Sequence, residues 1–154
     1  MNLTDHFTLE EMVISEVASR KGLDNTPSDA IVASLTRVAQ FLEQVRSTAK
    51  TAFGPDKVIV VTSGYRSPAV NEAVGGVSTS AHCFGLAADI HCPGVPVLDL
   101  AKLIEQKLIG YDQLIHEFGA WVHVGLSVAG NSPRHQSLTI GGHPTSTRTG
   151  LWPL

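Results

Sequence analysis

The sequence predicts an α+β fold in which N-terminal helices pack on a small, mostly antiparallel sheet. A stripe of apolar residues at helical spacing fills residues 31–49 and precedes the segments that read as strands. Short apolar runs follow it, and two of them, 112–118 and 121–126, flank a tight turn that predicts a β-hairpin. With 154 residues and a mass of 16.4 kDa, the chain fits one compact domain.

The N-terminal region is expected to form two helices. Thr8 and Glu11 match a capping box, and apolar residues at helical spacing predict a first helix over residues 8–20 with a stop at Gly22. Ser28 follows a turn and can cap the second helix. The apolar stripe of the second helix indicates packing on a core and consists of Ile31, Leu35, Val38, Leu42, Val45 and Ala49.

Strands and shorter helices are expected in the middle of the chain. A Gly-Pro-Asp sequence at 54–56 ends the second helix, and residues 57–62 form an apolar run typical of a buried strand. Ser67 and Pro68 match an N-cap and a first helical position, which predicts a short helix to about Val74. The remaining expected elements are a strand over 86–91, a helix over 97–108 and the two hairpin strands 112–118 and 121–126.

The C-terminal segment differs in composition from the rest of the chain. Residues 127–154 contain no Asp, Glu or Lys and are rich in Ser, Thr, Gly and Pro, and only 137–140 suggests a strand. We therefore divide the chain into a folded domain over 1–126 and a tail over 127–154. The tail is expected to be extended or partly disordered, with Trp152 fixing its end.

Composition and charge exclude several classes of protein. Lys and Arg number 11 against 14 Asp and Glu, so the net charge is −3, which argues against nucleic-acid partners and stable membrane association. The N-terminus has no basic region followed by an apolar run, so we expect a protein made in the cytoplasm without a signal peptide. Seven histidines in a chain that is only 16% charged hint at metal chemistry.

His82 and Asp89 form the first group of residues that could carry chemistry. The imidazole of His82 falls on a glycine-containing loop, and the carboxylate of Asp89 falls on the strand that follows. Asp89 stands between Ala88 and Ile90 in an apolar strand, where an unpaired charge is costly. A metal ion or another cation is therefore expected beside Asp89.

The second group lies on the predicted hairpin. Side chains alternate along a strand, so Trp121, His123 and Gly125 share one face. A turn at 119–120 brings Glu117 near His123. One Asp and two His leave Zn²⁺ an open fourth position for water, and a nearby Glu can accept the proton of that water.

Several motifs, in matching order and spacing, together resemble a known family over about residues 5–126. The family is that of the zinc D-Ala-D-Ala carboxypeptidases, which also holds L-Ala-D-Glu endopeptidases of phage lysins and vancomycin-resistance dipeptidases. The N-terminal motifs resemble the branch that is common in phage genomes. The motifs are Phe7–Met12, Gly22–Asn25, Ser63–Pro68 with Asn71, Gly75–Gly76 with Ser78, Ser80, His82, Gly85, Ala87 and Asp89, and Asp112–Ile115 with Glu117 and Trp121–Val124.

The resemblance implies a metal centre and a catalytic pair. His82, Asp89 and His123 match the family's ligands for one zinc ion. Glu117 matches the general base that activates water at the zinc ion. Arg66 matches the arginine that binds substrate and stabilises the oxyanion.

The resemblance also implies two further substrate contacts. Ser80 matches a serine that holds the carboxylate end of the substrate, although capping of a loop is an alternative role. Trp121 matches an aromatic residue beside the last ligand, with a packing or positioning role.

His91 lies on the same strand face as Asp89. It either supports the ligands from behind or has a purely structural role. Cys83 and Cys92 are expected to pack rather than to bind metal.

The implied activity is that of a zinc metallopeptidase that cleaves the peptidoglycan stem peptide in phage lysis or cell-wall remodelling, on a hedgehog/DD-peptidase fold. The favoured specificity is D-Ala-D-Ala carboxypeptidase, and the alternative is L-Ala-D-Glu endopeptidase, as in an endolysin. A non-catalytic zinc-containing binding domain or virion part is an alternative of another class, against which Glu117 and Arg66 count. The protein would reach the cell wall after holin release or as a virion component.

Overall fold

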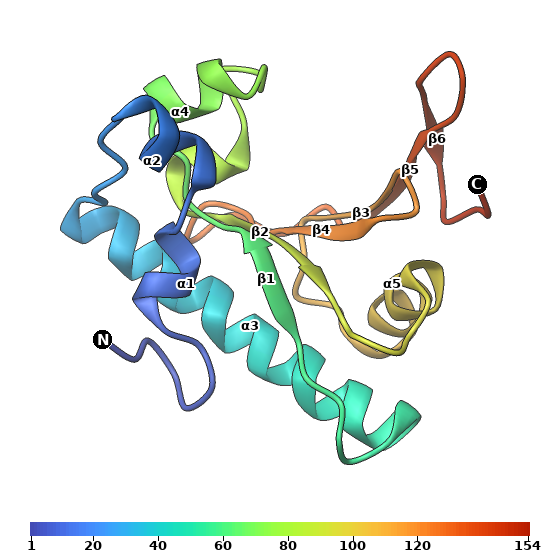
Figure 1. The fold of residues 1–154 in the computed structure, drawn as a ribbon. Coiled ribbons are helices and arrows are strands. Elements are labelled where there is room, and N and C mark those ends of the chain that lie inside the picture. The colour runs from blue at the N-terminus through green and yellow to red at the C-terminus, as the bar shows by residue number, and fades with distance from the viewer.

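The computed structural model describes residues 1–154 and contains one six-stranded sheet with helices packed against it (Figure 1). The strand order is β1-β2-β4-β3-β5-β6, and every neighbouring pair is antiparallel except β3 and β5. The α+β class and the mostly antiparallel sheet are thereby confirmed. The strands are β1 (Val60–Ser63), β2 (Ala87–His91), β3 (Gln113–Glu117), β4 (Trp121–Gly125), β5 (Gln136–Gly141) and β6 (Ser146–Thr149).

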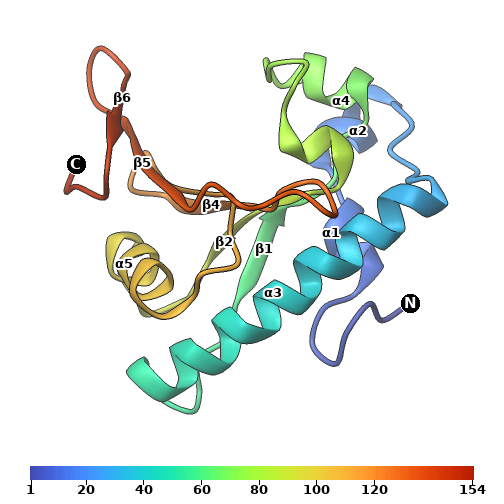
Figure 2. The ribbon, with the colours of Figure 1, turned by 180° about the vertical axis from the view of Figure 1, so that it is seen from behind.

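Helices lie on both sides of the sheet. The two longest, α3 and α5, lie on one side of it, whereas α2 and α4 lie together at one end on the other side (Figures 1 and 2). No helix is both long enough and apolar enough to cross a membrane. The helices are α1 (Leu9–Val13), α2 (Glu16–Lys21), α3 (Asp29–Phe53), α4 (Pro68–Ala73), α5 (Val97–Lys107) and the 3-10 helix η1 (Ala81–Phe84).

The core fills the space between the sheet and the pair α3 and α5. Alternate residues of the central strands face these helices and are fully buried, because successive side chains of a strand point to opposite faces. The other face of the same strands is therefore free to carry polar groups. The core-facing strand residues are Ala88, Ile90, Leu114, Val122 and Val124.

The N-terminal region departs from the expected single helix over 8–20. The capping box of Thr8 and Glu11 is present, but α1 ends at Val13 and α2 starts anew with Ser15 as its N-cap. The carbonyl oxygen of Met12 accepts from the backbone N–H of Tyr65 at 2.7 Å. The carbonyl oxygen of Val13 accepts from the Asn25 amide at 2.7 Å. Because both carbonyl groups bind elsewhere, the first helix cannot continue, and its prediction as one helix is wrong.

The remaining predicted elements agree with the structure to within a few residues. Ser28 caps α3, and Ser67 caps α4 with Pro68 as its first residue. The hairpin of β3 and β4 is present, with Glu117 opposite Trp121. The largest shift is in β1, which begins at Val60 rather than at residue 57.

The C-terminal segment is part of the sheet. β5 confirms the strand suggested at 137–140, whereas the expectation of an extended or partly disordered tail is wrong for β6. β5 pairs in parallel with β3, and β6 pairs with β5. The chain end is held by Trp152, whose backbone N–H donates to Thr139 and whose carbonyl oxygen lies 3.0 Å from Nδ1 of His116. The division of the chain at residue 126 stays a prediction.

Candidate metal centre

His82, Asp89 and His123 lie together on the face of the sheet opposite the core. β2 and β4 place Asp89 directly across from His123, and η1 brings His82 to the same point. The Asp89 Oδ1 atom lies 3.1 Å from Nδ1 of His123 and 3.3 Å from Nε2 of His82. His123 is 8% exposed and His82 is 2% exposed. The structure thus brings together the three residues that the sequence indicated as metal ligands.

These three side chains fit a zinc ion. Tetrahedral Zn²⁺ with nitrogen and oxygen ligands at about 2.0–2.2 Å separates neighbouring ligand atoms by about 3.3–3.5 Å, close to the two distances above. One ligand atom from each residue falls within 4.8 Å of the others. The Nδ1 atom of His82 donates to the Gly64 carbonyl oxygen at 2.7 Å, which leaves Nε2, 3.3 Å from Oδ1 of Asp89, as the ring atom that can bind a metal ion. Ligating histidines commonly donate their other N–H in this way.

The charge of Asp89 is stabilised within the cluster. Burial opposes ionisation of this carboxyl group, but hydrogen bonds with His123 and His82 outweigh the burial and hold the pKa of Asp89 below its usual value. Asp89 is therefore an anion at neutral pH, as a metal ligand must be.

The turn that carries His82 depends on a serine and a glycine. The Ser80 hydroxyl group accepts from the backbone N–H of His82 at 3.3 Å and caps η1, which agrees with the loop-capping role. Gly85 ends η1 with φ 66°, a left-handed conformation that glycine adopts without strain. A Cβ atom at Gly85 would lie 2.9 Å from the backbone and side chain of Ile31 on α3. Glycine thus lets η1 approach α3 closely.

Glu117 faces the same cavity, at the end of β3. The cavity has a volume of about 450 Å³ and includes the three candidate ligands in its wall. Burial and the nearby charge of Asp89 raise the pKa of Glu117, while His123 and Arg66 oppose that rise. A carboxylate with a raised pKa is a better proton acceptor, which suits a general base.

Arg66 and Trp121 complete the predicted set. The backbone N–H of Arg66 donates to the His82 carbonyl oxygen at 3.1 Å, and both Arg66 and Trp121 line the cavity, as does Ser80. Nε of Arg66 and Nε1 of Trp121 are buried without a hydrogen-bond partner in the protein. Buried donors are normally paired, so these two donors are not fully satisfied by protein groups.

The other histidines and the cysteines lie outside the cavity wall. His91 ends β2 and pairs with Val60 of β1. His116 points to the other face of β3 and contacts the carbonyl group of Trp152. Cys83 and Cys92 are free thiols.

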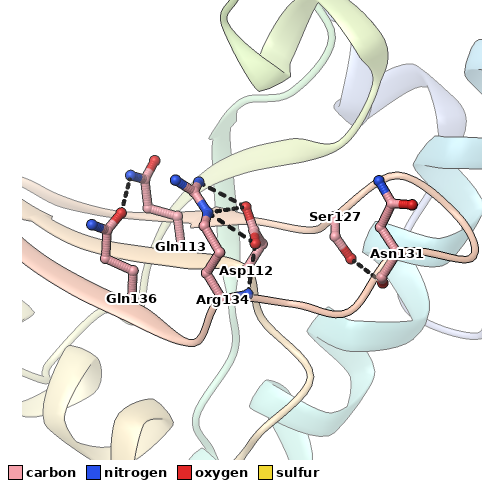
Figure 3. Close-up of polar contacts among 6 residues, drawn as sticks. All are labelled: Asp112, Gln113, Ser127, Asn131, Arg134 and Gln136. Carbon is pink, nitrogen blue, oxygen red and sulfur yellow. Dashed lines mark hydrogen bonds and ion pairs between the residues drawn. The ribbon is translucent and has the colours of Figure 1, made fainter.

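Arg134 is a charged residue of the cavity wall that sequence reasoning missed. Arg134 lies in the loop before β5 and forms an ion pair with Asp112 at the start of β3 (Figure 3). The only sequence signal is that Arg134 is one of two arginines in a segment without Asp, Glu or Lys. Its position depends on the pairing of β5 with β3, which the local pattern does not encode.

The chain matches a known protein family. A family model described as Peptidase M15 matches residues 5–125, which is more than half of the chain. The match includes all three candidate ligands and stops before the loop that carries Arg134. No curated protein matches the chain.

Proposed function

The chain belongs to the peptidase M15 family, whose members are zinc-dependent peptidases, and we propose that it is a D-Ala-D-Ala carboxypeptidase. Family membership supports a zinc peptidase that acts on peptidoglycan in general. The observation that carries the proposal is the convergence of the cluster His82, Asp89 and His123 with Glu117 and Arg66 on one cavity.

We assign one zinc ion to His82, Asp89 and His123. When bound there, zinc supplies a Lewis acid that polarises the scissile carbonyl group and makes a water molecule more acidic. The Gly64 carbonyl group orients His82 for this role, and the Asp89 carboxylate provides the negative charge that a cation needs.

Glu117 acts as general base and then as general acid. Its carboxylate accepts a proton from the attacking water and passes it to the nitrogen of the leaving amine, so that the residue ends in its starting state. The raised pKa of Glu117 favours the first of these transfers.

Arg66 binds substrate and stabilises the charge that develops on the carbonyl oxygen. Arg66 lines the cavity, and a guanidinium group carries five N–H donors. Preorganised donors of this kind act most strongly in a cavity from which water is excluded. Ser80 and Trp121 are assigned to substrate contacts in the same wall.

One observation favours an L-Ala-D-Glu endopeptidase as the second candidate. Arg66 also lines a neighbouring cavity of about 390 Å³, between the start of α2, β1 and α4. A second cavity beside Arg66 offers space for an extended peptide, whereas a carboxypeptidase binds a chain that ends next to the scissile bond.

Digestion of purified muropeptides, with and without a chelator, tests these candidates by mass spectrometry. Chelator-sensitive release of D-Ala is expected for the carboxypeptidase. A cut between L-Ala and D-Glu supports the endopeptidase instead, and the absence of products with any divalent metal favours a non-catalytic binding or virion role. Expression of the protein inside cells, with and without a co-expressed holin, tests whether it reaches the cell wall after holin release.

A further inference from the structure

Arg134 shares the cavity of the candidate metal centre although it lies beyond the family match. It occupies the loop that connects β4 to β5, while the match ends at residue 125. Together with Arg66, it provides the cationic side chains of the cavity wall. Arg66 is assigned to the reacting carbonyl group, so Arg134 is available for another part of the substrate.

Asp112 holds the guanidinium group of Arg134 in a fixed orientation. The Nε atom lies 3.1 Å from both carboxylate oxygens, and Nη2 donates to Oδ2 at 2.8 Å (Figure 3). The backbone N–H of Arg134 also donates to Oδ1 at 2.8 Å. A bidentate pair of this kind fixes the plane of the guanidinium group as well as its position.

The loop is also anchored at its other end. Arg37 of α3 donates to the carbonyl oxygen of Ser127 at 3.0 Å, and the Ser127 hydroxyl group donates to the carbonyl oxygen of Asn131 at 3.0 Å. Anchors at both ends hold the loop, and with it Arg134, in one place. A preorganised group loses little conformational entropy when it binds a ligand.

One edge of the guanidinium group remains free. Asp112 engages Nε and Nη2, whereas Nη1 has no partner, and the Arg134 side chain is 60% exposed. A guanidinium group has five N–H donors, and its fork matches the two oxygens of a carboxylate. Both oxygens of Asp112 already accept hydrogen bonds from Arg134. The donors on the free edge are therefore available to an anion that comes from outside the protein.

We propose that Arg134 determines specificity by binding a carboxylate of the stem peptide with the free edge of its guanidinium group. This inference rests on the proposed function, because the stem peptide supplies the carboxylate. Two sources are chemically equivalent, namely the C-terminal carboxylate and the free carboxylate that D-Glu retains within the chain. Asp112 is a positioning residue that acts only through Arg134.

Binding of three synthetic stem peptides to the zinc-loaded protein tests the proposal. One peptide has both carboxylates free, one has a C-terminal carboxamide, and one carries D-isoglutamine in place of D-Glu. Titration calorimetry on a Glu117→Gln background gives Kd without turnover, and kcat/KM is measured with Glu117 present. We expect amidation of the contacted carboxylate to weaken binding about tenfold, the scale of a charge-assisted hydrogen bond.

Arg134→Gln is expected to abolish this discrimination. Its Kd values for the peptide with the free carboxylate and for the amidated peptide should agree within a factor of about two. The affinity for the first should fall to that for the second. Arg148→Gln is the matched control, because Arg148 stacks over Trp152 at 4.1 Å and lies outside the cavity wall. That variant should retain the tenfold preference. Arg134→Lys keeps the charge but loses the fork, and should discriminate less than the parent protein.

Two results would overturn the proposal. One is equal affinity of the parent protein for all three peptides. The other is loss of affinity in Arg134→Gln by the same factor for acids and amides, which indicates that the residue only shapes the loop. Absence of cleavage despite carboxylate-dependent binding contradicts the proposed function and leaves the role of Arg134 intact. Thermal unfolding of each variant identifies any loss of folded protein.

Discussion

Asp89 and His123 lie directly opposite each other on β2 and β4, and Oδ1 of Asp89 is 3.1 Å from Nδ1 of His123. The antiparallel pairing of two central strands therefore brings together two of the three candidate ligands. The third, His82, comes from η1, the turn that leads into β2. Because the cluster joins these elements, metal binding and the stability of the sheet are expected to be linked.

Replacement of Glu117 should separate catalysis from metal binding. Glu117→Gln keeps the shape of the side chain but cannot accept a proton, so kcat should fall about 10²–10⁴-fold. Zinc content, measured by atomic emission after dialysis, should stay near one ion per chain because Glu117 is not part of the ligand cluster.

His82→Ala is the matched control for this prediction. It removes a ligand, so zinc content and activity should fall together. If Glu117→Gln lost as much zinc as His82→Ala, the assignment of Glu117 as a base outside the metal shell would be wrong.

Removal of zinc should lower the melting temperature of the protein. An ion that binds only the folded state stabilises it by RT ln(1 + [L]/Kd), about 4 kcal/mol at a thousand-fold excess over Kd. For a domain of this size, such a change corresponds to a shift of roughly 10 °C or more. Calorimetry with and without a chelator measures the shift. An equal effect of the chelator on Asp89→Ala would show that the stabilising ion binds elsewhere.

The ligand set could be predicted from the sequence because the motifs that carry it resemble a known family, and the local patterns agree with that assignment. Asp89 stands in an apolar strand, and the alternation of a strand assigns His123 to the face of Trp121. The break after Val13 could not be predicted, because distant groups, the Asn25 amide among them, bind the carbonyl groups that a longer helix would use. Arg134 was missed for a similar reason, since it reaches the cavity only through the parallel pairing of β5 with β3.

Two glycines with the same positive φ should respond differently to replacement by alanine. Gly85 and Gly119 both have φ 66°, so each alanine variant loses about 1–2 kcal/mol to the left-handed conformation. A Cβ atom at Gly119 meets nothing within 4 Å, whereas at Gly85 it meets Ile31 at 2.9 Å. Gly85→Ala should therefore lose about 1–3 kcal/mol more, the usual cost of overpacking.

Urea denaturation measures the difference between the two glycine variants. Gly85→Ala should also bind zinc more weakly, because Gly85 ends the turn that carries His82. Equal free energies of unfolding for the two variants would contradict the close approach of η1 to α3.

Truncation after Leu126 should destabilise the domain rather than release a separate tail. The truncated chain loses β5, which pairs with β3, and loses His135, which stacks on the fully buried Tyr111 with ring centroids 4.1 Å apart. An unpaired β3 edge is also a template for aggregation. Size-exclusion chromatography and urea denaturation measure both effects. A monomeric truncated chain of unchanged stability would support the division at residue 126.

The ion pair between Asp112 and Arg134 should stabilise the fold at neutral pH and lose this effect in acid. The hydrogen bonds from Arg134 hold the pKa of Asp112 below its usual value in the folded state. A group with a lowered folded pKa contributes stability that is present above its unfolded pKa and is lost as the pH falls through the folded pKa. The loss is therefore expected below about pH 4, the ordinary range of an aspartate.

The difference in free energy of unfolding between the parent protein and Arg134→Gln isolates this contribution. Other acidic groups with lowered pKa values, such as Asp24 and Glu43, titrate in both proteins and cancel in the difference. At pH 7 the difference should be about 0.5–1 kcal/mol, because the arginine is largely exposed and solvent screens the pair. Urea denaturation between pH 7 and pH 2.5 should show the difference shrinking as Asp112 becomes protonated. A difference that stayed constant over this range would mean that Arg134 stabilises the loop by packing, because packing does not depend on the charge of Asp112.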